Sequence, residues 1–330
     1  MNYGVFGGRE VFYESVEAER RIRPYIRETP AEYSQYLSNM GRCNVYLKLE
    51  NMQLSGSFKL RGAFNKLLTL NKNEKEAGII TASSGNHAAA VTLAMGNLGV
   101  KGTIFVPENI AKVKLEVLEL YKADLTYHGT DMGVTESYAR KFAIENGRLF
   151  ISPYNDARII GGQGTIGIEL ESQIKKIDAV FVPVGGGGLM AGISGYLKSV
   201  NPDIEIIGCQ PENSCVMYES IKAGKIVDIE SGPTLADGTA GGIEPGSLTF
   251  NICKDCVDDF VILTENEISK AIKLVLQKFY MVIEGAAALS VAAFMKVKKN
   301  YAGKNVILII SGKKISIDTL SKIICSPENL

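Results

Sequence analysis

The stretch AVFVPVGGGGL, residues 179–189, carries the strongest local signal in the chain. Its first half, Ala179 to Val184, is apolar and rich in valine, as expected for a buried strand. Its second half, Gly185 to Gly188, brings a backbone without side chains to the start of a predicted helix. Such a turn can approach an anion and direct free N–H groups and the positive end of the helix dipole at it. We interpret residues 185–189 as a phosphate-binding turn, with a purely structural turn as the alternative.

The sequence around this turn limits which phosphate-containing ligands are expected. Gly186, Gly188 and Ala191 match a GxGxxA dinucleotide pattern, but that pattern expects an acidic residue at the end of the next strand. The next predicted strand instead ends in Cys209 and Gln210. The chain also contains no GxxxxGK[ST] motif. A dinucleotide is therefore the weaker interpretation, and a P-loop nucleotide site is not expected.

Short β-branched runs alternate with helix-length amphipathic segments on both sides of this stretch, which predicts an α/β fold with largely parallel sheets. The predicted strands are 45–49, 78–82, 102–106, 124–128, 149–152, 179–184, 204–209, 258–263 and 305–310. The predicted helices are 57–70, 86–98, 110–121, 133–146, 164–175, 189–200, 265–279, 285–299 and 317–324. Their irregular spacing favours two sheets over one barrel, and the lack of a long linker favours two intertwined domains.

The composition is that of an ordinary globular protein. The chain has 330 residues, with 36 Lys plus Arg against 36 Asp plus Glu, and 46% of its residues are hydrophobic. This balance argues against a nucleic-acid coat or a polybasic membrane binder. No segment has the apolar length of a membrane span, and residues 1–13 lack a signal-peptide core. We expect a cytoplasmic protein with no nucleic-acid and no membrane partner.

The cysteine pattern predicts reduced thiols and no metal site. Six cysteines in a chain of this length are too few for a disulfide scaffold. Cys253 and Cys256 have CxxC spacing, but a zinc site needs four ligands, and the only histidines are His87 and His128.

A second motif is the sequence SGSFKLRGA, residues 55–63. Ser57 is a candidate helix N-cap, which would place Lys59 in the first helical turn. There the helix dipole opposes a positive charge and favours a neutral, nucleophilic amine. Taken alone, Lys59 fits an ordinary solvated lysine better.

A third motif is TASSGNH, residues 81–87, between a predicted strand and a predicted helix. Hydroxyl groups and free N–H groups at a helix start suit a carboxylate, although a structural helix cap is an alternative. His87 is either a general base or a structural hydrogen-bonder, and Ser84 has the better placed hydroxyl. A lysine, a carboxylate cradle and a phosphate cradle together indicate pyridoxal-phosphate chemistry on an amino acid.

With these motifs the chain resembles the serine/threonine dehydratase and serine racemase group of pyridoxal-phosphate enzymes. The resemblance runs from about Arg27 to Asp318 and includes the segments IEGAA (283–287) and LIISG (308–312). It implies a two-domain α/β fold of the tryptophan synthase β type, or fold type II, with mostly parallel twisted sheets flanked by helices. The implied large cofactor-binding domain comprises residues 1–75 and 154–330, and the small domain, closing over the substrate, residues 76–153. The resemblance also implies a homodimer.

The resemblance assigns a role to each motif residue. Lys59 would hold pyridoxal 5′-phosphate as an imine and then act as the base at the substrate Cα. Phe58 would pack on the cofactor ring, Asn86 would hydrogen-bond its 3′ oxygen, and Ser311 would meet the ring nitrogen. The substrate carboxylate would lie on Ser83, Ser84, Gly85, Asn86 and His87, with Ser84 as acid/base on the opposite face. The phosphate would lie on Gly185, Gly186, Gly187, Gly188 and Leu189.

The implied reaction converts a β-hydroxy amino acid of the L-threonine or L-serine class into a 2-oxo acid and ammonia. The alternatives are a serine racemase, a threo-3-hydroxyaspartate dehydratase and a β-replacement enzyme of a specialised pathway. A catalytically silent protein that binds the cofactor or an amino acid is the alternative outside enzymes.

Three departures from the family pattern bear on these expectations. Lys313 and Lys314 replace the usual Gly-Asn, which raises the question of an acidic substrate. Gln210 stands where many relatives have a glutamate that helps to hold a divalent cation, so no metal is expected there. Little chain follows Ser311, so we expect no regulatory domain and no feedback by isoleucine.

Overall fold

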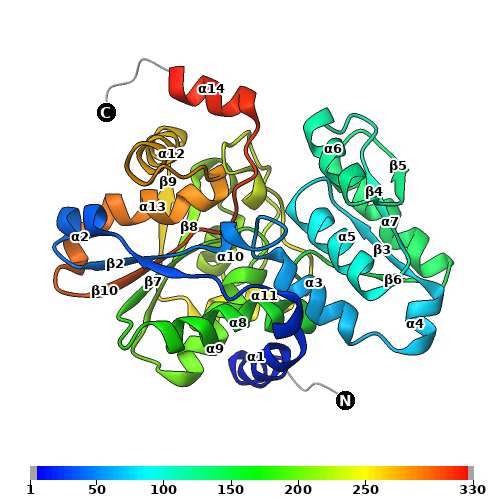
Figure 1. Ribbon diagram of the computed structural model, residues 1–330, viewed down its shortest axis with the longest axis horizontal. Coiled ribbons are helices and arrows are strands. Elements are labelled where there is room, and N and C mark those ends of the chain that lie inside the picture. The colour runs from blue at the N-terminus through cyan, green and yellow to red at the C-terminus, as the bar shows by residue number, and fades with distance from the viewer. Residues whose placement is uncertain (1–5, 326–330) are drawn as a thin grey trace.

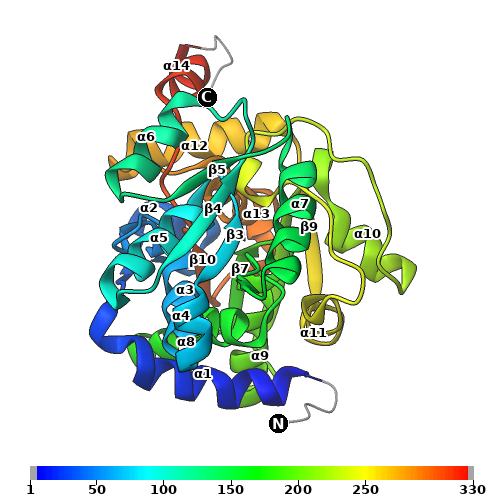
Figure 2. The same cartoon turned by 90° about the vertical axis from the view of Figure 1, so that its right-hand side faces the viewer.

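The structure is a computed structural model that describes residues 6–325. Residues 1–5, part of the stretch searched for a signal peptide, and residues 326–330 lie outside it. Two sheets organise the described chain, with strand orders β1-β2-β10-β7-β8-β9 and β5-β4-β3-β6. Helices flank both sheets (Figures 1 and 2). The predicted α/β architecture with two sheets is therefore confirmed.

The larger sheet combines strands from both halves of the chain. Parallel pairing joins β2 to β10, β10 to β7, β7 to β8 and β8 to β9, whereas β1 pairs antiparallel with β2. The strands are β1 (Ala31–Tyr33), β2 (Asn44–Lys48), β7 (Ala179–Pro183), β8 (Glu205–Pro211), β9 (Asp259–Leu263) and β10 (Asn305–Ile309).

Alternation along β7 explains why helices cover both faces of this sheet. Val180 and Val182 point to one hydrophobic cluster, and Ala179 and Phe181 point to the other. The first cluster lies under α1 (Gly8–Ile22), α8 (Ala157–Gln173), α9 (Gly188–Val200), α10 (Val216–Ala223) and α11 (Leu248–Cys256). The second lies under α2 (Gln35–Gly41), α12 (Glu265–Phe279), α13 (Gly285–Val297) and α14 (Ile317–Cys325).

The smaller sheet is parallel throughout and comes from one continuous part of the chain. Its strands are β3 (Ile79–Ala82), β4 (Gly102–Val106), β5 (Leu125–Tyr127) and β6 (Leu149–Phe150). The associated helices are α4 (Lys72–Ala77), α5 (Asn86–Leu98), α6 (Lys112–Leu120) and α7 (Met132–Glu145). Helix α3 (Lys59–Leu68) packs on both α5 and α8 and so links the two sheets. Lys59, its first residue, consequently lies where the two parts of the molecule meet.

Most predicted elements are present, and the differences have local causes. The helices 86–98 and 265–279 have the predicted bounds, whereas β1, α1, α2, α4, α10 and α11 were missed. Helix α8 begins at Ala157, well before the predicted residue 164, because Asp156 accepts hydrogen bonds from the N–H groups of Arg158 and Ile159. Short 3₁₀ helices complete the chain: η1 (Arg23–Tyr25), η2 (Glu50–Met52), η3 (Glu212–Ser214), η4 (Asp237–Thr239) and η5 (Lys298–Tyr301).

Among the helices of residues 6–325, none has the length and apolar character needed to cross a bilayer. In the same described residues, no three His, Cys, Asp or Glu side chains gather in a way that could hold a metal ion. All six cysteines are free thiols.

Candidate active site

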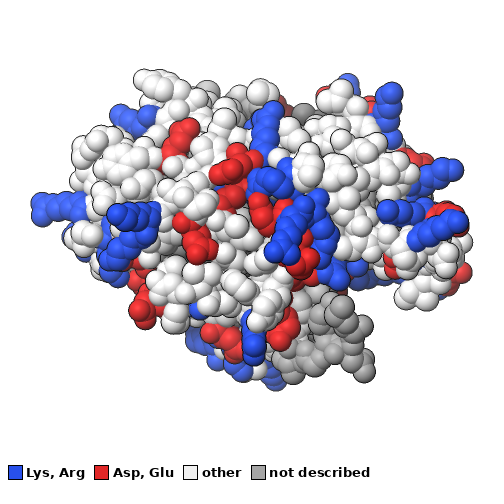
Figure 3. Space-filling model, turned by 60° about the horizontal axis from the view of Figure 1, so that its bottom comes forward, with Lys and Arg blue, Asp and Glu red and all other residues white. Residues whose placement is uncertain are grey.

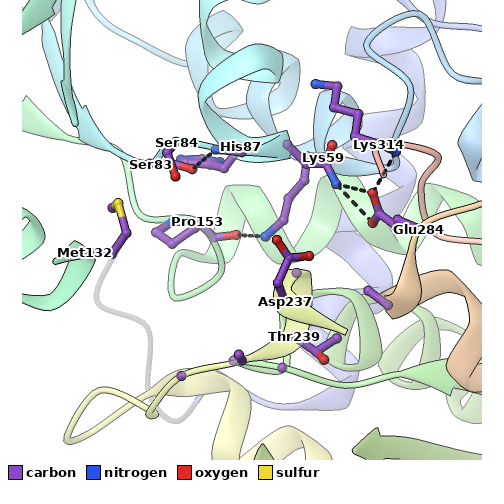
Figure 4. Close-up of a pocket in the computed structure, with 18 of the residues that line it drawn as sticks. Lys59, Ser83, Ser84, His87, Met132, Pro153, Asp237, Thr239, Glu284 and Lys314 are labelled. Atoms are coloured by element: carbon purple, nitrogen blue, oxygen red, sulfur yellow. Dashed lines mark hydrogen bonds between the residues drawn. The ribbon is translucent and has the colours of Figure 1, made fainter. Parts of the chain in front are cut away.

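A cleft of about 1000 Å³ lies between the two sheets. Every residue that the sequence predicted for the site lines this cleft. These are Phe58, Lys59, Ser83, Ser84, Gly85, Asn86, His87, Gly185, Gly186, Gly187, Gly188, Leu189 and Ser311. Figure 4 labels Lys59, Ser83, Ser84 and His87 among them. The structure therefore brings together motifs that are far apart in the sequence.

The four glycines connect β7 to α9, and their neighbours leave no room for side chains. A Cβ on Gly185 would lie 2.9 Å from the backbone of Thr239, and a Cβ on Gly186 would lie 2.5 Å from the ring of Tyr154. Gly187 is the N-cap of α9 and has a φ of +88°, which favours glycine. Packing thus requires glycine here as well, and the first N–H groups of α9 have no acceptor within the helix.

The segment before Lys59 is tied to the segment after β10 rather than capped by serine. Ser57 pairs with Gly312 in an isolated β-bridge, and the Phe58 N–H donates to the Ser311 carbonyl at 3.1 Å. The N-cap of α3 is Phe58, and it makes no side-chain capping bond. The prediction that Ser57 caps this helix is therefore wrong, because its neighbours hold it in the bridge.

The Lys59 amine is half-buried and donates a hydrogen bond to the Pro153 carbonyl at 2.8 Å. Burial lowers the pKa of Lys59 to about 8, although the Glu284 carboxylate opposes this shift. A lysine with such a pKa is neutral far more often near neutral pH than an ordinary lysine, which helps it to act as a nucleophile or base.

The loop 83–87 joins β3 to the N-terminus of α5. The Ser83 hydroxyl accepts a hydrogen bond from the Gly85 N–H at 3.2 Å, and the Ser84 side chain lines the cleft. His87 is buried, and its Nε2 lies 3.1 Å from the Thr81 hydroxyl and 3.2 Å from the Ile151 carbonyl. Burial, together with the charge of Lys59, lowers the pKa of His87 to about 3. These contacts and this pKa fit the second of the two predicted roles, a neutral structural hydrogen-bonder.

Glu284 is a site residue whose role the sequence analysis missed. Its carboxylate is buried and accepts hydrogen bonds from Asn86 Nδ2 at 2.9 and 3.0 Å and from the Lys314 backbone N–H at 3.1 Å. Burial raises the pKa of Glu284 to about 7. The available signal was a single acidic residue in the otherwise apolar segment Ile283 to Ala288.

The two lysines that replace the usual Gly-Asn have different surroundings. Lys313 is exposed and lies against Gly56, outside the cleft lining. Lys314 lines the cleft, and its side chain extends away from the Glu284 carboxylate (Figure 4). Burial lowers the pKa of Lys314 to about 8.

Several polar atoms in the cleft are buried without a hydrogen-bond partner. They are Ser311 Oγ, Asn86 Oδ1 and Lys314 Nζ. An unsatisfied buried polar group costs about 1–3 kcal/mol. A polar ligand in the cleft would offset this cost by supplying hydrogen bonds to these three atoms.

A second polar cluster lies behind Lys59, and its charges are paired. Arg61, on the same helix, contacts Glu50 at 2.7 Å and Glu169 at 2.7 Å. Lys48 contacts Glu169 at 2.6 Å, and Thr29 donates to Glu50 at 2.5 Å. We call these five residues the ion cluster. All five are buried, so the cluster fixes the position of α3.

Comparisons with known proteins agree with this geometry. The catabolic L-threonine dehydratase TdcB of Staphylococcus aureus (strain USA300) is 42% identical over 312 residues, which cover 93% of this chain and 90% of that protein. The processed form of threonine deaminase isoform 2 from Solanum lycopersicum has a TM-score of 0.91 at 33% identity, covering 95% of this chain and 92% of that one. Maize serine racemase has a TM-score of 0.89 at 32% identity, covering 95% and 96%. The family described as "Pyridoxal-phosphate dependent enzyme" matches residues 22–312. The chain therefore belongs to the pyridoxal-phosphate-dependent enzymes of this family, with the fold type II architecture of its relatives.

Proposed function

We propose that the protein is an ammonia-lyase that converts a β-hydroxy amino acid of the L-threonine or L-serine class into a 2-oxo acid and ammonia. The observation that carries this proposal is the Lys59 amine, which lies in the cleft with a lowered pKa beside the 83–87 loop. The 42% identity with a catabolic L-threonine dehydratase supports the choice of reaction. Water leaves from Cβ first, and hydrolysis of the product restores it, so the net change is the release of ammonia.

The residues of the cleft fit pyridoxal phosphate. The unpartnered Ser311 Oγ and the Asn86 amide offer hydrogen bonds to a polar ring, and the first turn of α9 offers free N–H groups to a phosphate. The Lys59 amine is the nucleophile that a carbonyl cofactor requires. When bound, pyridoxal phosphate supplies the electron sink for the substrate Cα.

In this proposal each protein group has a defined task. Lys59 anchors the cofactor and then removes the proton from the substrate Cα, since its amine is readily neutral. The N–H groups at the start of α5, in the segment Ser83 to His87, bind the substrate carboxylate. Ser84 Oγ carries a proton on the opposite face. The segment Gly185 to Leu189 binds the phosphate, Phe58 packs on the cofactor ring, and Ser311 contacts the ring nitrogen.

The domain and assembly proposals rest on separate observations. We propose that residues 76–153 form the small domain that closes over the substrate and excludes water, since this part of the chain contains all of the smaller sheet.

The exposed apolar side chains of Met52, Leu54, Tyr280 and Val282 support a homodimer, because Asn51 bonds to Met281 and so brings their two segments together. Light scattering on the wild type and on a Tyr280→Glu variant tests this contact.

Location and partners are also proposals. Free thiols at all six cysteines support a cytoplasmic location. On the face in Figure 3, Lys and Arg side chains lie among Asp and Glu side chains. Such a mixture differs from the clustered basic surface that neutralises nucleic-acid phosphates, and it supports the proposal that nucleic acid is not a partner. The Gln210 amide oxygen accepts a hydrogen bond from the Tyr218 N–H at 2.8 Å. We predict that no metal binds at Gln210, and calorimetric titration with magnesium or calcium tests this prediction.

Two further candidate functions have specific support. The 32% identity with maize serine racemase supports racemisation, in which Ser84 would return a proton to the opposite face. The unpartnered Lys314 amine supports an acidic substrate such as threo-3-hydroxyaspartate. A β-replacement enzyme and a silent binder remain the other predictions.

One product assay separates these functions. The purified protein is incubated with L-threonine, L-serine or threo-3-hydroxyaspartate, and 2-oxo acid, ammonia and the D-enantiomer are measured. We expect 2-oxo acid and ammonia in equal amounts. The D-enantiomer alone would indicate a racemase, a substituted amino acid would indicate a β-replacement enzyme, and cofactor absorbance without any of these products would indicate a silent binder.

A further inference from the structure

The contact between Glu284 and Asn86 connects the cofactor site to a buried acid. Both oxygens of the Glu284 carboxylate accept a hydrogen bond from Asn86 Nδ2, at 2.9 and 3.0 Å. Asn86 Oδ1, the other end of the amide, is buried and has no partner. A carboxylate can only accept hydrogen bonds, so ionised Glu284 engages the Asn86 NH2 group and leaves Oδ1, an acceptor, without a partner.

This arrangement leaves at most one of the two Asn86 N–H groups for the partner proposed for Asn86. The 3′ oxygen of the cofactor is an acceptor when ionised and needs the Asn86 N–H group. If the amide turns to supply it, Asn86 Oδ1 faces Glu284. Two acceptors then meet in a buried place, which is unfavourable unless one of them acquires a proton.

We propose that Glu284 is a positioning residue that takes up a proton from solvent when the cofactor binds, and that its protonated carboxyl then holds Asn86 with the amide N–H toward the cofactor. The inference rests on the proposed function, because it uses the proposed contact between Asn86 and the 3′ oxygen. The only bond that forms at Glu284 is the O–H bond of its carboxyl group, and the proton comes from solvent.

The surroundings of Glu284 make this proton uptake feasible. Its side chain is 5% exposed, and burial disfavours its charge. The Asp237 carboxylate, on η4, favours the neutral acid, whereas the Lys314 amine favours the ionised form. Lys59 also faces Glu284, from α3. A bound phosphate and an ionised 3′ oxygen add negative charge to the cleft and favour the neutral acid further.

The neighbouring glycine shows that the carboxyl position is built into the fold. A Cβ on Gly312 would lie 2.4 Å from Glu284 Oε1. The Glu284 backbone N–H also donates to the Gly312 carbonyl at 3.2 Å. Glu284 is therefore held by its main chain on one side and by Asn86 on the other. A change in the protonation of the Glu284 carboxyl consequently changes its hydrogen bonds to the Asn86 amide.

Calorimetry of cofactor binding tests the proposal. Pyridoxal phosphate is titrated into the full chain, freed of cofactor, in two buffers of different ionisation enthalpy at about pH 8, where Glu284 is mostly ionised. We expect the wild type to take up about one proton more per site than Glu284→Gln, since glutamine resembles the protonated acid and can donate without titrating. Above pH 7, cofactor affinity of the wild type should fall roughly tenfold more per pH unit than that of the variant.

Two controls make the result specific. Asp237→Asn removes a nearby negative charge that does not contact Asn86, and it should keep the extra proton. Asn86→Ala removes the amide and should lose it, which also decides the question if Glu284→Gln does not fold. Equal proton uptake by the wild type, Glu284→Gln and Asn86→Ala would overturn the proposal. If the wild type binds cofactor and forms 2-oxo acid, such a result overturns this inference alone, whereas absence of cofactor binding overturns the proposed function.

Discussion

Helix α3 separates two buried polar clusters that differ in one respect. In the ion cluster behind it, Arg61, Lys48, Glu50 and Glu169 are all paired with opposite charges. In the cleft in front of it, Ser311 Oγ, Asn86 Oδ1 and Lys314 Nζ have no partners. Both clusters lie among buried residues, so burial alone does not distinguish a structural group from a functional one.

The difference lies in whether the protein satisfies its own polar groups. A fully paired buried cluster fixes the position of the helix and leaves nothing for a ligand. An incompletely satisfied cluster has a free-energy cost that a ligand can remove. Lys59 and Arg61 are two residues apart in the sequence, yet one faces the cleft and the other the ion cluster.

Replacing Lys59 should have the largest effect. Lys59→Ala removes the cofactor anchor and the proposed base, so we expect the visible absorbance of the cofactor to be lost and 2-oxo acid formation to fall at least about 10⁴-fold. Lys313→Ala, at the exposed lysine outside the cleft, is the control and should keep both. Absorbance and product assays measure the effect, and a Lys59→Ala protein with wild-type turnover would contradict the assignment.

Breaking the ion cluster should affect stability rather than chemistry. Glu169→Gln leaves Arg61 and Lys48 without their shared counter-charge, and we expect the free energy of unfolding to fall by about 3–5 kcal/mol. The exposed Glu17 pairs with Arg20, and Glu17→Gln should change stability by less than about 1 kcal/mol. Denaturant titration measures both. Equal effects of the two substitutions would refute the view that the ion cluster supports α3.

The pH dependence of stability should reveal the titration of Glu284. Its folded-state pKa of about 7 lies above the ordinary value of 4.5, so the folded chain binds the extra proton between these values. This contribution to stability is complete below about pH 4.5 and is lost as the pH rises through 7, by roughly 3 kcal/mol in total. Glu284→Gln should lack this loss. Unfolding of the cofactor-free proteins at pH 5 and pH 8 tests the difference, and parallel curves would disprove it.

A smaller effect is expected at the glycine turn. Gly186→Ala would place a methyl group 2.5 Å from the Tyr154 ring, and we expect a loss of stability of about 1–3 kcal/mol together with weaker cofactor binding. Gly96→Ala, in helix α5 with no neighbouring atom near the new methyl group, should instead stabilise by about 0.5–1 kcal/mol. Thermal unfolding compares the two variants, and a neutral Gly186→Ala would contradict the packing argument.

The site motifs could be predicted because their signals are local. The tetraglycine turn, the 83–87 loop and Lys59 each follow a strand or begin a helix, and a short window of sequence contains the whole pattern. The α/β fold was predictable for the same reason, since alternation of strands and helices is visible along the chain. The assigned roles of the individual residues stay predictions.

The missed features depend on contacts between distant residues. Arg61 bonds to Glu169, 108 positions away, and Asn86 bonds to Glu284, 198 positions away. No local sequence pattern predicts such a pair. Ser57 resembled a helix cap locally, but its bridge to Gly312 comes from the other end of the chain. The antiparallel strand β1 has only three residues and lies at the edge of the sheet, so its periodic signal is short.

The most direct measurement is the absorbance of the purified wild type and of Lys59→Ala, recorded while L-threonine and L-serine are added and 2-oxo acid is assayed. The account predicts a visible cofactor band that depends on Lys59, changes on substrate addition and is accompanied by 2-oxo acid and ammonia. A wild-type protein that binds no pyridoxal phosphate, or that forms 2-oxo acid equally well without Lys59, would contradict it.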